Sequence, residues 1–304
     1  GHKEGGGGPA ILDETSEMKF IAITDADAKK SVEENKNAKE VMLYMESPKE
    51  REYIKRIKEL PTSTEKRVIS FGLYGDNPKY TTGAIRNAEL RDTYFPGWVC
   101  RFYVDDSVPK DIISKLEELG SEIVHQKGLA GATGGMFWRF LVADDPTVDR
   151  YIVRDSDSRL NARDRFAVEE GIESGKCIHN CRDHVNHVRT MNGGMWGGRK
   201  GCIPGASIEE GAKNFGKDKY MQDIYFLEQI IWPLVKDDQM SHDAYSCAKF
   251  PNARPFPTQR DENYQHVGQV FFEDDSPRMN DITGFIKGKE NDPKCRAKPE
   301  YIYG

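Results

Sequence analysis

Strand-like and helix-like segments alternate from Arg67 onward, and this alternation limits the possible fold more than any other feature of the chain. RVISFGL at residues 67–73 is the first β-rich run, and a helical stretch follows at 81–93. A second strand is expected at 98–104, an amphipathic helix at 109–119 and a third strand at 121–125. A repeated strand–helix order favours a mainly parallel sheet with helices on both faces. We therefore predict an α/β, Rossmann-like domain.

The same alternation continues in the second half of the chain. The helical segment MFWRFLVADD leads into the apolar strand DRYIV, which ends at Val153. After it we expect a helix near 163–174, a strand at 176–181, a Gly-rich segment at 191–198 and a helix near 218–235. Ligands of such sheets bind beyond the carboxyl ends of the strands, so the residues that follow Val153 are the first place to look for chemistry.

The flanks of this domain have a different texture. Residues 1–17 begin GHKEGGGGPA and are predicted to be a tag or flexible lead, with Met18 as a candidate native start. Residues 18–65 are predicted to be an accessory segment with one helix at 49–60. The catalytic domain is expected at 66–248, and residues 249–304, rich in Pro, Asn, Asp and Lys, are expected to form a wrapping tail.

Composition excludes some classes of partner. The 304 residues carry a net charge of -6, so the electrostatic attraction of a basic surface to nucleic acid is missing. No run approaches the roughly 20 apolar residues of a membrane span, and no signal-peptide core is visible. Six scattered cysteines, several in apolar segments, are interpreted as thiols in a reducing compartment. We therefore expect a soluble, cytoplasmic protein.

A cluster of metal-ligating residue types lies between residues 177 and 187. Its members are Cys177, His179, Cys181, His184 and His187. The spacing C-x3-C followed by H-x2-H differs from the usual zinc patterns, and the first three residues alternate as one face of a strand would. The pattern therefore favours a strand over a structural zinc site.

The acidic pair Asp155 and Asp157 directly follows the strand that ends at Val153. In extended geometry both side chains point to the same side, with Cα atoms about 6.5 Å apart. Both carboxylates then approach one hard cation such as Mn²⁺ or Mg²⁺, which also keeps positions for diphosphate oxygens. D-x-D alone is a weak signal, because a solvated turn after a strand has the same pattern.

The surrounding sequence strengthens the signal. GMFWRFLVADDPTVDRYIVRDSDSRL resembles the GT-A glycosyltransferases, particularly the branch of glycogenin and the lipopolysaccharide galactosyltransferases, in which an Arg-bearing helix leads into an apolar strand ending in D-x-D. MNGGMWGG, QDIYFLEQIIWPLV and SHDAY resemble later family segments in the same order. The resemblance covers roughly residues 67–250 as a layout and implies a single GT-A-type domain.

The resemblance implies roles for individual residues at the metal and the reacting centre. His242 in SHDAY is the expected third metal ligand beside Asp155 and Asp157, and His266 is a rival. Asp223 is expected near the anomeric carbon or the acceptor hydroxyl, although a shift of one residue along the helix selects Gln222 instead. Residues expected to contact the donor diphosphate or sugar are Arg139, Arg154, Ser156, Asn192, Gly193 and Gly194.

Two loops at strand ends are expected to hold the nucleoside. The loop from Gly72 to Lys79 is placed against the base and ribose, with Tyr74 as a candidate for base stacking. Asp105 and Asp106 follow the second strand and are expected to accept hydrogen bonds from uracil or ribose hydroxyls. These assignments follow from position at strand ends and not from a specific motif.

The predicted function is transfer of a sugar from a nucleoside-diphosphate sugar, in first place a UDP-sugar, to a glycan or other hydroxyl acceptor. SHDAYSC departs from the H-x-x-G-x-x-K-P-W ending of glycogenin-like enzymes, which leaves the third ligand and the stereochemistry open. Two alternatives stay open: a non-catalytic sugar- or nucleotide-binding module on the same fold, and a metal-dependent nucleotidyltransferase. The absence of a G-x-x-x-x-G-K-[ST] loop speaks against the latter.

Overall fold

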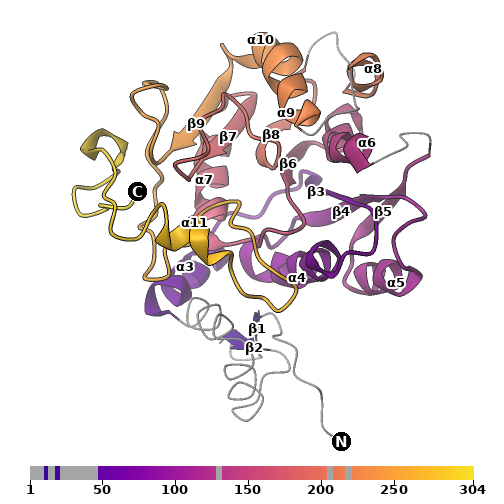
Figure 1. Ribbon diagram of the computed structural model, residues 1–304, viewed down its shortest axis with the longest axis horizontal. Helices are drawn as coiled ribbons and strands as arrows, with labels where there is room; N and C mark the ends of the chain where they lie inside the picture. Colours follow the sequence, from indigo (N-terminus) through magenta and orange to yellow (C-terminus); the bar gives the residue numbers. More distant parts are fainter. Residues whose placement is uncertain (1–9, 13–17, 21–46, 128–131, 204–207, 216–220) are drawn as a thin grey trace, which may run out of the picture.

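A central β-sheet organises the computed structural model, which describes residues 10–12, 18–20, 47–127, 132–203, 208–215 and 221–304. Seven described strands form this sheet in the order β5-β4-β3-β6-β8-β7-β9 (Figure 1). Their bounds are β3 Arg67–Leu73, β4 Val99–Val104, β5 Glu122–His125, β6 Arg150–Arg154, β7 Ile178–Arg182, β8 Met195–Arg199 and β9 Gln239–Asp243.

The direction of the strands places the site. β3 pairs in parallel with both β4 and β6, β4 with β5, and β7 with β9. β8 is antiparallel to both of its neighbours, β6 and β7. The predicted α/β fold with a mainly parallel sheet is therefore confirmed. Because β8 is reversed, the segment that enters it lies beside the residues that leave β6, where the acidic pair is found.

Helices cover both faces of the sheet, as predicted. On one face, α3 (Pro48–Lys58), α4 (Pro78–Tyr94), α5 (Lys110–Glu118) and α7 (Ala162–Glu173) pack on apolar side chains of β3, β4 and β6. On the other face lie α6 (Ala132–Trp138), the 3₁₀-helix η1 (Arg139–Asp144), α8 (Ile208–Asn214) and α9 (Gln222–Phe226). Successive residues of a strand point to opposite faces, so Ile69 packs in the core on the first face and Val68 in the core on the second.

Two strands and one helix differ from the sequence prediction. Part of the Gly-rich segment 191–198 forms strand β8, and the segment containing His242 forms β9. The helix expected near 218–235 is helical from Gln222 and passes through a π-helical turn, η2 (Leu227–Ile231), before α10 (Trp232–Val235). Pro233 explains the wider turn, because proline lacks the N–H that a regular α-helix requires and clashes with the carbonyl four residues earlier.

In the described parts of the flanking segments, the regular elements are α3 and several short pieces. Within the lead predicted at 1–17, β1 (Ala10–Leu12) pairs with β2 (Met18–Phe20), so a strand forms there. Beyond β9, the described helices are the short α11 (Met279–Thr283) and the 3₁₀-helix η3 (Pro293–Cys295). In Figure 1 this tail runs back along the side of the domain that carries α3, α7 and β9. None of the described helices is long and apolar enough to cross a bilayer.

The cysteines correct one prediction. Cys177 is bonded to Cys202, and Cys247 is bonded to Cys295, while Cys100 and Cys181 are buried free thiols. The expectation of six thiols is therefore wrong for four of them. Disulfides persist in oxidising compartments, so these two bonds do not fit the reducing compartment that scattered cysteines suggested. Alternation of cysteines along a sequence carries no information about which ones meet in space.

Candidate active site

The loop after β6 forms the centre of the candidate site. Asp155 begins a tight turn in which the backbone N–H and the hydroxyl of Ser158 both donate to the Asp155 carbonyl, at 3.1 and 2.7 Å. The expected extended D-x-D is therefore a turn. The two carboxylates still interact, because Asp155 is among the groups that raise the pKa of Asp157.

Reversed strand β8 brings the Asn-Gly-Gly segment to this turn. Arg154, the last residue of β6, pairs with Met195, the first residue of β8. Gly194 consequently packs on the acidic pair: a Cβ built on it would lie 2.2 Å from an Oδ of Asp155. A Cβ on Gly193 would lie 2.6 Å from Nη2 of Arg139. Only glycine permits approaches this close, so both positions are explained by packing against charged side chains.

Arg139 joins three segments that are far apart in sequence. Its guanidinium contacts the carboxylate of Asp155 through Nη1 and lies 3.0 Å from Oδ2 of Asp223 through Nη2. Burial lowers the pKa of Arg139, but the two carboxylates outweigh it and the net shift is upward. Asp223 has a completely buried side chain, and its second oxygen, Oδ1, has no hydrogen-bond partner among the described residues. It is Asp223, not Gln222, that makes this contact.

Asp157 has its own basic partner. Nζ of Lys79, in the first turn of α4, lies 3.0 Å from Oδ2 of Asp157. Burial and the neighbouring Asp155 raise the pKa of Asp157 and outweigh the opposite effect of Lys79. The Asp157 carbonyl accepts from the N–H of Phe271 at 2.9 Å, which brings the C-terminal tail to the site. The side chain of Asp155 is 41% exposed, so this end of the pair is open to a ligand.

Asn87 on α4 hydrogen-bonds to the backbone of the turn that begins at Asp155, and the sequence analysis did not single it out. Its buried amide donates to the carbonyls of Ser156 and Ser158, at 3.3 and 2.9 Å, and its Oδ1 accepts from the N–H of Leu160. Ser156 is buried with its carbonyl against Gly83 of α4. The structure therefore puts Ser156 on the packing side of the turn, and its predicted donor contact has no support. The available signal was an Asn in the middle of the predicted helix 81–93, a position that asparagine usually disfavours.

Arg154 was also predicted to bind the donor, and the structure corrects this. Its side chain is fully buried and makes paired bonds to both oxygens of Asp164, at 2.6 and 2.7 Å. A third nitrogen donates to the carbonyls of Val153 and Trp196. All of these partners belong to the protein core, so Arg154 joins β6 to α7 and β8 and has no group left for a ligand.

His242 does not join the acidic pair. It lies in β9 with its ring buried, Nδ1 2.8 Å from Nε2 of His179 and Nε2 2.7 Å from a carboxylate oxygen of Glu170. Both ring nitrogens are therefore occupied at the edge of the sheet. The register of a strand that was not predicted decided this placement.

Three other histidines gather near the acidic turn. The rings of His184, His187 and His266 are in mutual contact, with centroids 4.7 to 5.8 Å apart. Asp155 is among the charges that act on the pKa of His187, which burial and His184 lower to about 4. Nδ1 of His266 is buried without a hydrogen-bond partner in the described part of the chain. His266, the rival candidate, thus has a buried ring nitrogen that no described residue hydrogen-bonds.

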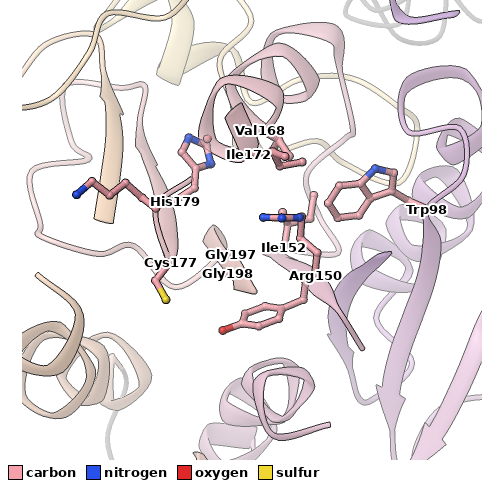
Figure 2. A pocket seen from close by; sticks show the side chains of 12 residues that line it. Trp98, Arg150, Ile152, Val168, Ile172, Cys177, His179, Gly197 and Gly198 are labelled. Carbon is pink, nitrogen blue, oxygen red and sulfur yellow. The ribbon is translucent and has the colours of Figure 1, made fainter. Parts of the chain in front are cut away.

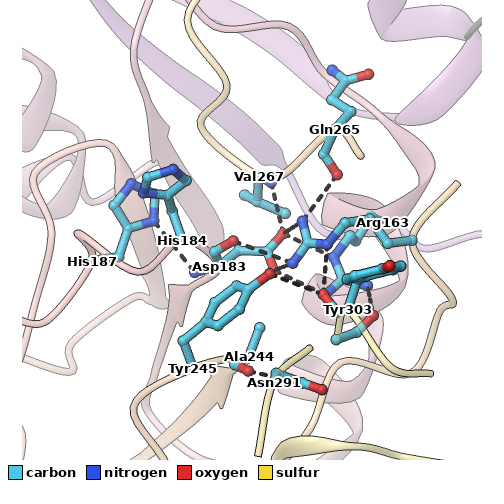
Figure 3. A network of polar contacts seen from close by, with 12 residues as sticks. Arg163, Asp183, His184, His187, Ala244, Tyr245, Gln265, Val267, Asn291 and Tyr303 are labelled. Carbon is cyan, nitrogen blue, oxygen red and sulfur yellow. Dashed lines mark hydrogen bonds and ion pairs between the residues drawn. The ribbon is translucent and has the colours of Figure 1, made fainter. Parts of the chain in front are cut away.

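A buried ion cluster around Asp183 holds the backbone at Gln265 and Val267, the two neighbours of His266 (Figure 3). Both oxygens of Asp183 accept from Arg163, at 2.8 Å each, and Asp183 also accepts from Arg260 at 2.7 Å. The N–H of Val267 donates to Asp183, and the carbonyl of Gln265 accepts from Arg260. The residues on either side of His266 are thus tied to one carboxylate, which holds the tail against the domain.

The two predicted nucleoside loops lie next to each other. Oδ1 of Asp105 accepts from Ser107, and the hydroxyl oxygen of Ser107 accepts from the N–H of Gly75 at 2.6 Å. Asp106 is exposed beside them. Tyr74 packs edge-on against Trp138, with ring centroids 5.9 Å apart. Gly72 faces the carbonyl of Gly135, which a Cβ would approach to 3.1 Å.

The chemistry of the donor set fits a hard divalent cation. Asp155 and Asp157 supply carboxylate oxygens at a strand end, and in this structure Arg139 and Lys79 are their cationic partners. Carboxylate oxygens are the ligands that Mg²⁺ or Mn²⁺ prefers, together with water or phosphate oxygens, so a bound cation would share these carboxylates with the two basic side chains. The absence of a Cβ at Gly194 keeps one side of Asp155 clear.

Comparisons with known proteins add solved structures only. No protein-family model and no curated sequence matches the chain. Glucosyl-3-phosphoglycerate synthase from Mycobacterium tuberculosis, in complex with phosphoglyceric acid, is similar over 62% of this chain and 71% of its own, with a TM-score of 0.41 and 12% identity. The same synthase with Mn²⁺, UDP-glucose and phosphoglyceric acid gives a TM-score of 0.40 at 12% identity, with the same coverage.

A mannosyltransferase from Pyrobaculum calidifontis, in complex with GDP-Man and Mn²⁺, is similar over 66% of this chain and 62% of its own. Its TM-score is 0.38 at 12% identity. Similarity of this extent assigns no role to any residue of this chain. The function is therefore inferred from the side chains themselves.

Proposed function

We propose that the chain is a metal-dependent glycosyltransferase of the GT-A type that uses a nucleoside-diphosphate sugar, in first place a UDP-sugar. The observation that carries this proposal is Arg139, which bridges Asp155 and Asp223 while Gly193 packs on its guanidinium. One cationic fork, one exposed carboxylate and one buried carboxylate thus meet at the carboxyl ends of the strands. That combination suits a substrate with an anionic diphosphate and a sugar bearing hydroxyl groups.

Asp155 and Asp157 would hold Mn²⁺ or Mg²⁺. When bound, such a cation stabilises the negative charge that develops on the leaving nucleoside diphosphate. His266 is the proposed third ligand in place of His242, because its Nδ1 has no partner among the described residues. Five residues further along the chain, the N–H of Phe271 donates a hydrogen bond to the Asp157 carbonyl, which keeps the tail at this side of the site.

Other side chains would bind and orient the donor. Arg139 presents a planar fork of donors that matches phosphate oxygens, and ligand binding would share this fork with Asp155. Asp223 has one oxygen on Arg139 and one without a partner in the described structure, which suits hydrogen bonding to a sugar or acceptor hydroxyl. Tyr74 and Asp105, on loops joined by the Ser107–Gly75 bond, would contact the base and ribose.

The experiment is a panel of UDP- and GDP-sugars, each tested with Mn²⁺, with Mg²⁺ and with a chelator. Thermal stabilisation reports binding, because a ligand that binds only the folded state raises its stability, and release of the nucleoside diphosphate reports turnover. We expect both signals for a UDP-sugar with Mn²⁺. Asp157→Asn should remove them, whereas Asp92→Asn, an exposed acid on α4, should leave them unchanged.

Each outcome separates the alternatives. Mn²⁺-dependent stabilisation without any turnover across the panel would favour a non-catalytic binding module. Release of pyrophosphate from a nucleoside triphosphate would favour a nucleotidyltransferase. A parent protein that hydrolyses UDP-sugars equally well with and without a divalent cation would overturn the role given to the acidic pair.

A further inference from the structure

A second group of metal-ligating side chains lies at the opposite edge of the sheet from β5, between β7 and β9. His179 and Cys181 are two residues apart on β7, so their side chains leave the same face of the sheet. His242 on β9 is the register partner of Cys181 in this parallel pair. All three side chains are buried, and one ligand atom from each lies within 4.8 Å of the other two.

The distances within this group are close to those of a metal site. Nε2 of His179 lies 2.8 Å from Nδ1 of His242 and 3.8 Å from Sγ of Cys181. Two nitrogens on one tetrahedral zinc are about 3.3 Å apart, and a nitrogen and a sulfur about 3.5 Å apart, from ordinary bond lengths. The two rings therefore need to separate by about half an ångström to admit an ion.

We propose that His179, Cys181 and His242 form a zinc site, separate from the acidic pair. Two imidazole nitrogens and one thiolate are the ligand set that zinc selects, whereas Mn²⁺ and Mg²⁺ prefer oxygen. Three protein ligands leave the fourth tetrahedral position for water. The ion would join the edge strand β9 to β7, which carries the chain toward Asp183 and the histidines near the acidic turn.

Glu170 on α7 supplies the outer contact that zinc-bound histidines usually have. Its carboxylate lies 2.7 Å from Nε2 of His242. This bond places the proton of His242 on Nε2 and leaves Nδ1 with a lone pair facing His179 and the proposed ion. The tautomer that a metal ligand requires is therefore already favoured by the fold.

Binding requires the loss of the Cys181 proton. Burial raises the pKa of this thiol and outweighs the opposite effect of the nearby Arg154 guanidinium, so the metal must displace the proton from a thiol that otherwise keeps it. Formation of the Zn–S bond displaces the thiol proton to solvent, and His179 binds through Nε2 with its proton on Nδ1. Because Nδ1 of His242 is the acceptor in its 2.8 Å contact with His179, Nε2 of His179 carries a proton in the absence of an ion, and binding would move that proton to Nδ1.

Two features adjoin the site on different sides. The side chain of Glu170 is 35% exposed next to His242. On the other side, His179 lines a small pocket of about 20 Å³ between α7 and the sheet, together with Gly197, Gly198 and Trp98 (Figure 2). A volume of this size holds about one water molecule.

The test is a titration of the full chain, disulfides intact, with Co²⁺ as a coloured substitute for zinc. We expect a thiolate-to-cobalt absorption band that saturates near one equivalent and is removed by Zn²⁺ but not by Mn²⁺. Cys181→Ser should abolish the band, while Cys100→Ser, the matched control at the other buried thiol, should keep it. No band in the parent, or a band that survives Cys181→Ser, would overturn the proposal.

A second variant covers the case in which Cys181→Ser does not fold. Glu170→Ala removes the outer contact from a helix surface and keeps all three ligands, so it should weaken Co²⁺ binding by about 10- to 100-fold. An unchanged affinity would count against the site. Asp155→Asn should leave the cobalt band intact, which separates this site from the acidic pair whether or not the proposed function holds.

Discussion

Two arginine–aspartate clusters in this molecule have similar composition, but the hydrogen bonds of the carboxylate are fully satisfied in only one of them. In the tail cluster, Asp183 receives hydrogen bonds from Arg163, from Arg260 and from the Val267 backbone, so both carboxylate oxygens have several donors. In the site cluster, Asp223 has one bond to Arg139. Its Oδ1 and the Nε of Arg139 are buried without partners among the described residues.

The pKa values of the two carboxylates follow this difference. Burial raises the pKa of Asp183, but Arg163 and Arg260 outweigh burial and the net shift is strongly downward. For Asp223, burial outweighs Arg139, and the net shift is upward. A buried, incompletely paired carboxylate with a raised pKa, in contact with other charged groups, is typical of functional sites. The carboxylate of Asp183, with all its hydrogen bonds made, is thus structural, whereas Asp223 keeps an oxygen that a ligand can hydrogen-bond.

The largest expected effect is on stability, from Asp183→Asn. Removal of this charge leaves two buried arginines without a counterion, so we expect a loss of about 3–5 kcal/mol in the free energy of unfolding. Urea denaturation monitored by circular dichroism measures it. Asp223→Asn should cost much less, because its carboxylate has one basic partner. A smaller loss for Asp183→Asn than for Asp223→Asn would break the comparison.

The next effect is on turnover, from Asp223→Asn. The amide keeps the shape of the side chain and loses the charge that faces Arg139 and the proposed reacting centre, so we expect turnover to fall about 100-fold. Donor affinity should change far less, which is the mark of an interaction made mainly in the transition state. Steady-state kinetics with the donor found in the panel measures both. Gln222→Ala is the matched control. A larger loss of turnover in Gln222→Ala than in Asp223→Asn would assign the role to Gln222.

Gly194→Ala should give an intermediate effect confined to the site. The new Cβ would lie 2.2 Å from Oδ2 of Asp155, so the carboxylate must move. Because the obstructed atoms are the end of a side chain and not backbone, the fold should tolerate the change. We expect Mn²⁺-dependent UDP affinity to drop about tenfold, roughly 1.4 kcal/mol, in isothermal titration calorimetry. Unchanged affinity would show that Asp155 does not need its present position.

The smallest effect sharpens the comparison within the tail. Asp261 has an Oδ2 that is buried without a partner among the described residues, and burial raises its pKa to about 7. A folded-state pKa above the unfolded value gives stability that is present at low pH and lost as pH rises from about 4 through 7. Asp261→Asn removes this loss, so its gain over the parent should grow to about 1 kcal/mol at pH 8.

Thermal unfolding of the parent and Asp261→Asn at pH 5 and pH 8 measures that gain. At pH 5 the gain should be smaller than at pH 8, because only the part of the loss that accumulates between about pH 4 and 5 is then present. Equal differences at the two pH values would contradict the raised pKa.

The fold was largely predictable because its signals are local. RVISFGL became β3, and the apolar stripe of residues 109–119 became α5, since periodicity directly reports which side chains are buried. Strands β8 and β9 were not predicted, for two different reasons. β8 contains Gly197 and Gly198, which weaken strand propensity, and β9 is polar in sequence although its residues are mostly buried.

The candidate site was predictable only where residues are neighbours in sequence or follow a strand. Asp155 and Asp157 could be paired from spacing alone, but the meeting of Arg139 with Asp223 depends on helices 84 residues apart. His242 was misplaced because its own strand, β9, was not predicted, so its register against Cys181 was not known. Arg154 was misplaced because its partner Asp164 lies in the next helix and completes its hydrogen bonds in the core.

The most direct test of the central claim is the position of Mn²⁺ in a crystal of the protein with UDP. Anomalous scattering locates the ion independently of the coordinates of the chain. We predict a peak between the carboxylates of Asp155 and Asp157 with diphosphate oxygens beside it, and no peak in Asp157→Asn under the same conditions. A peak elsewhere, or UDP bound away from the acidic turn while the ion is present, would contradict the proposed function.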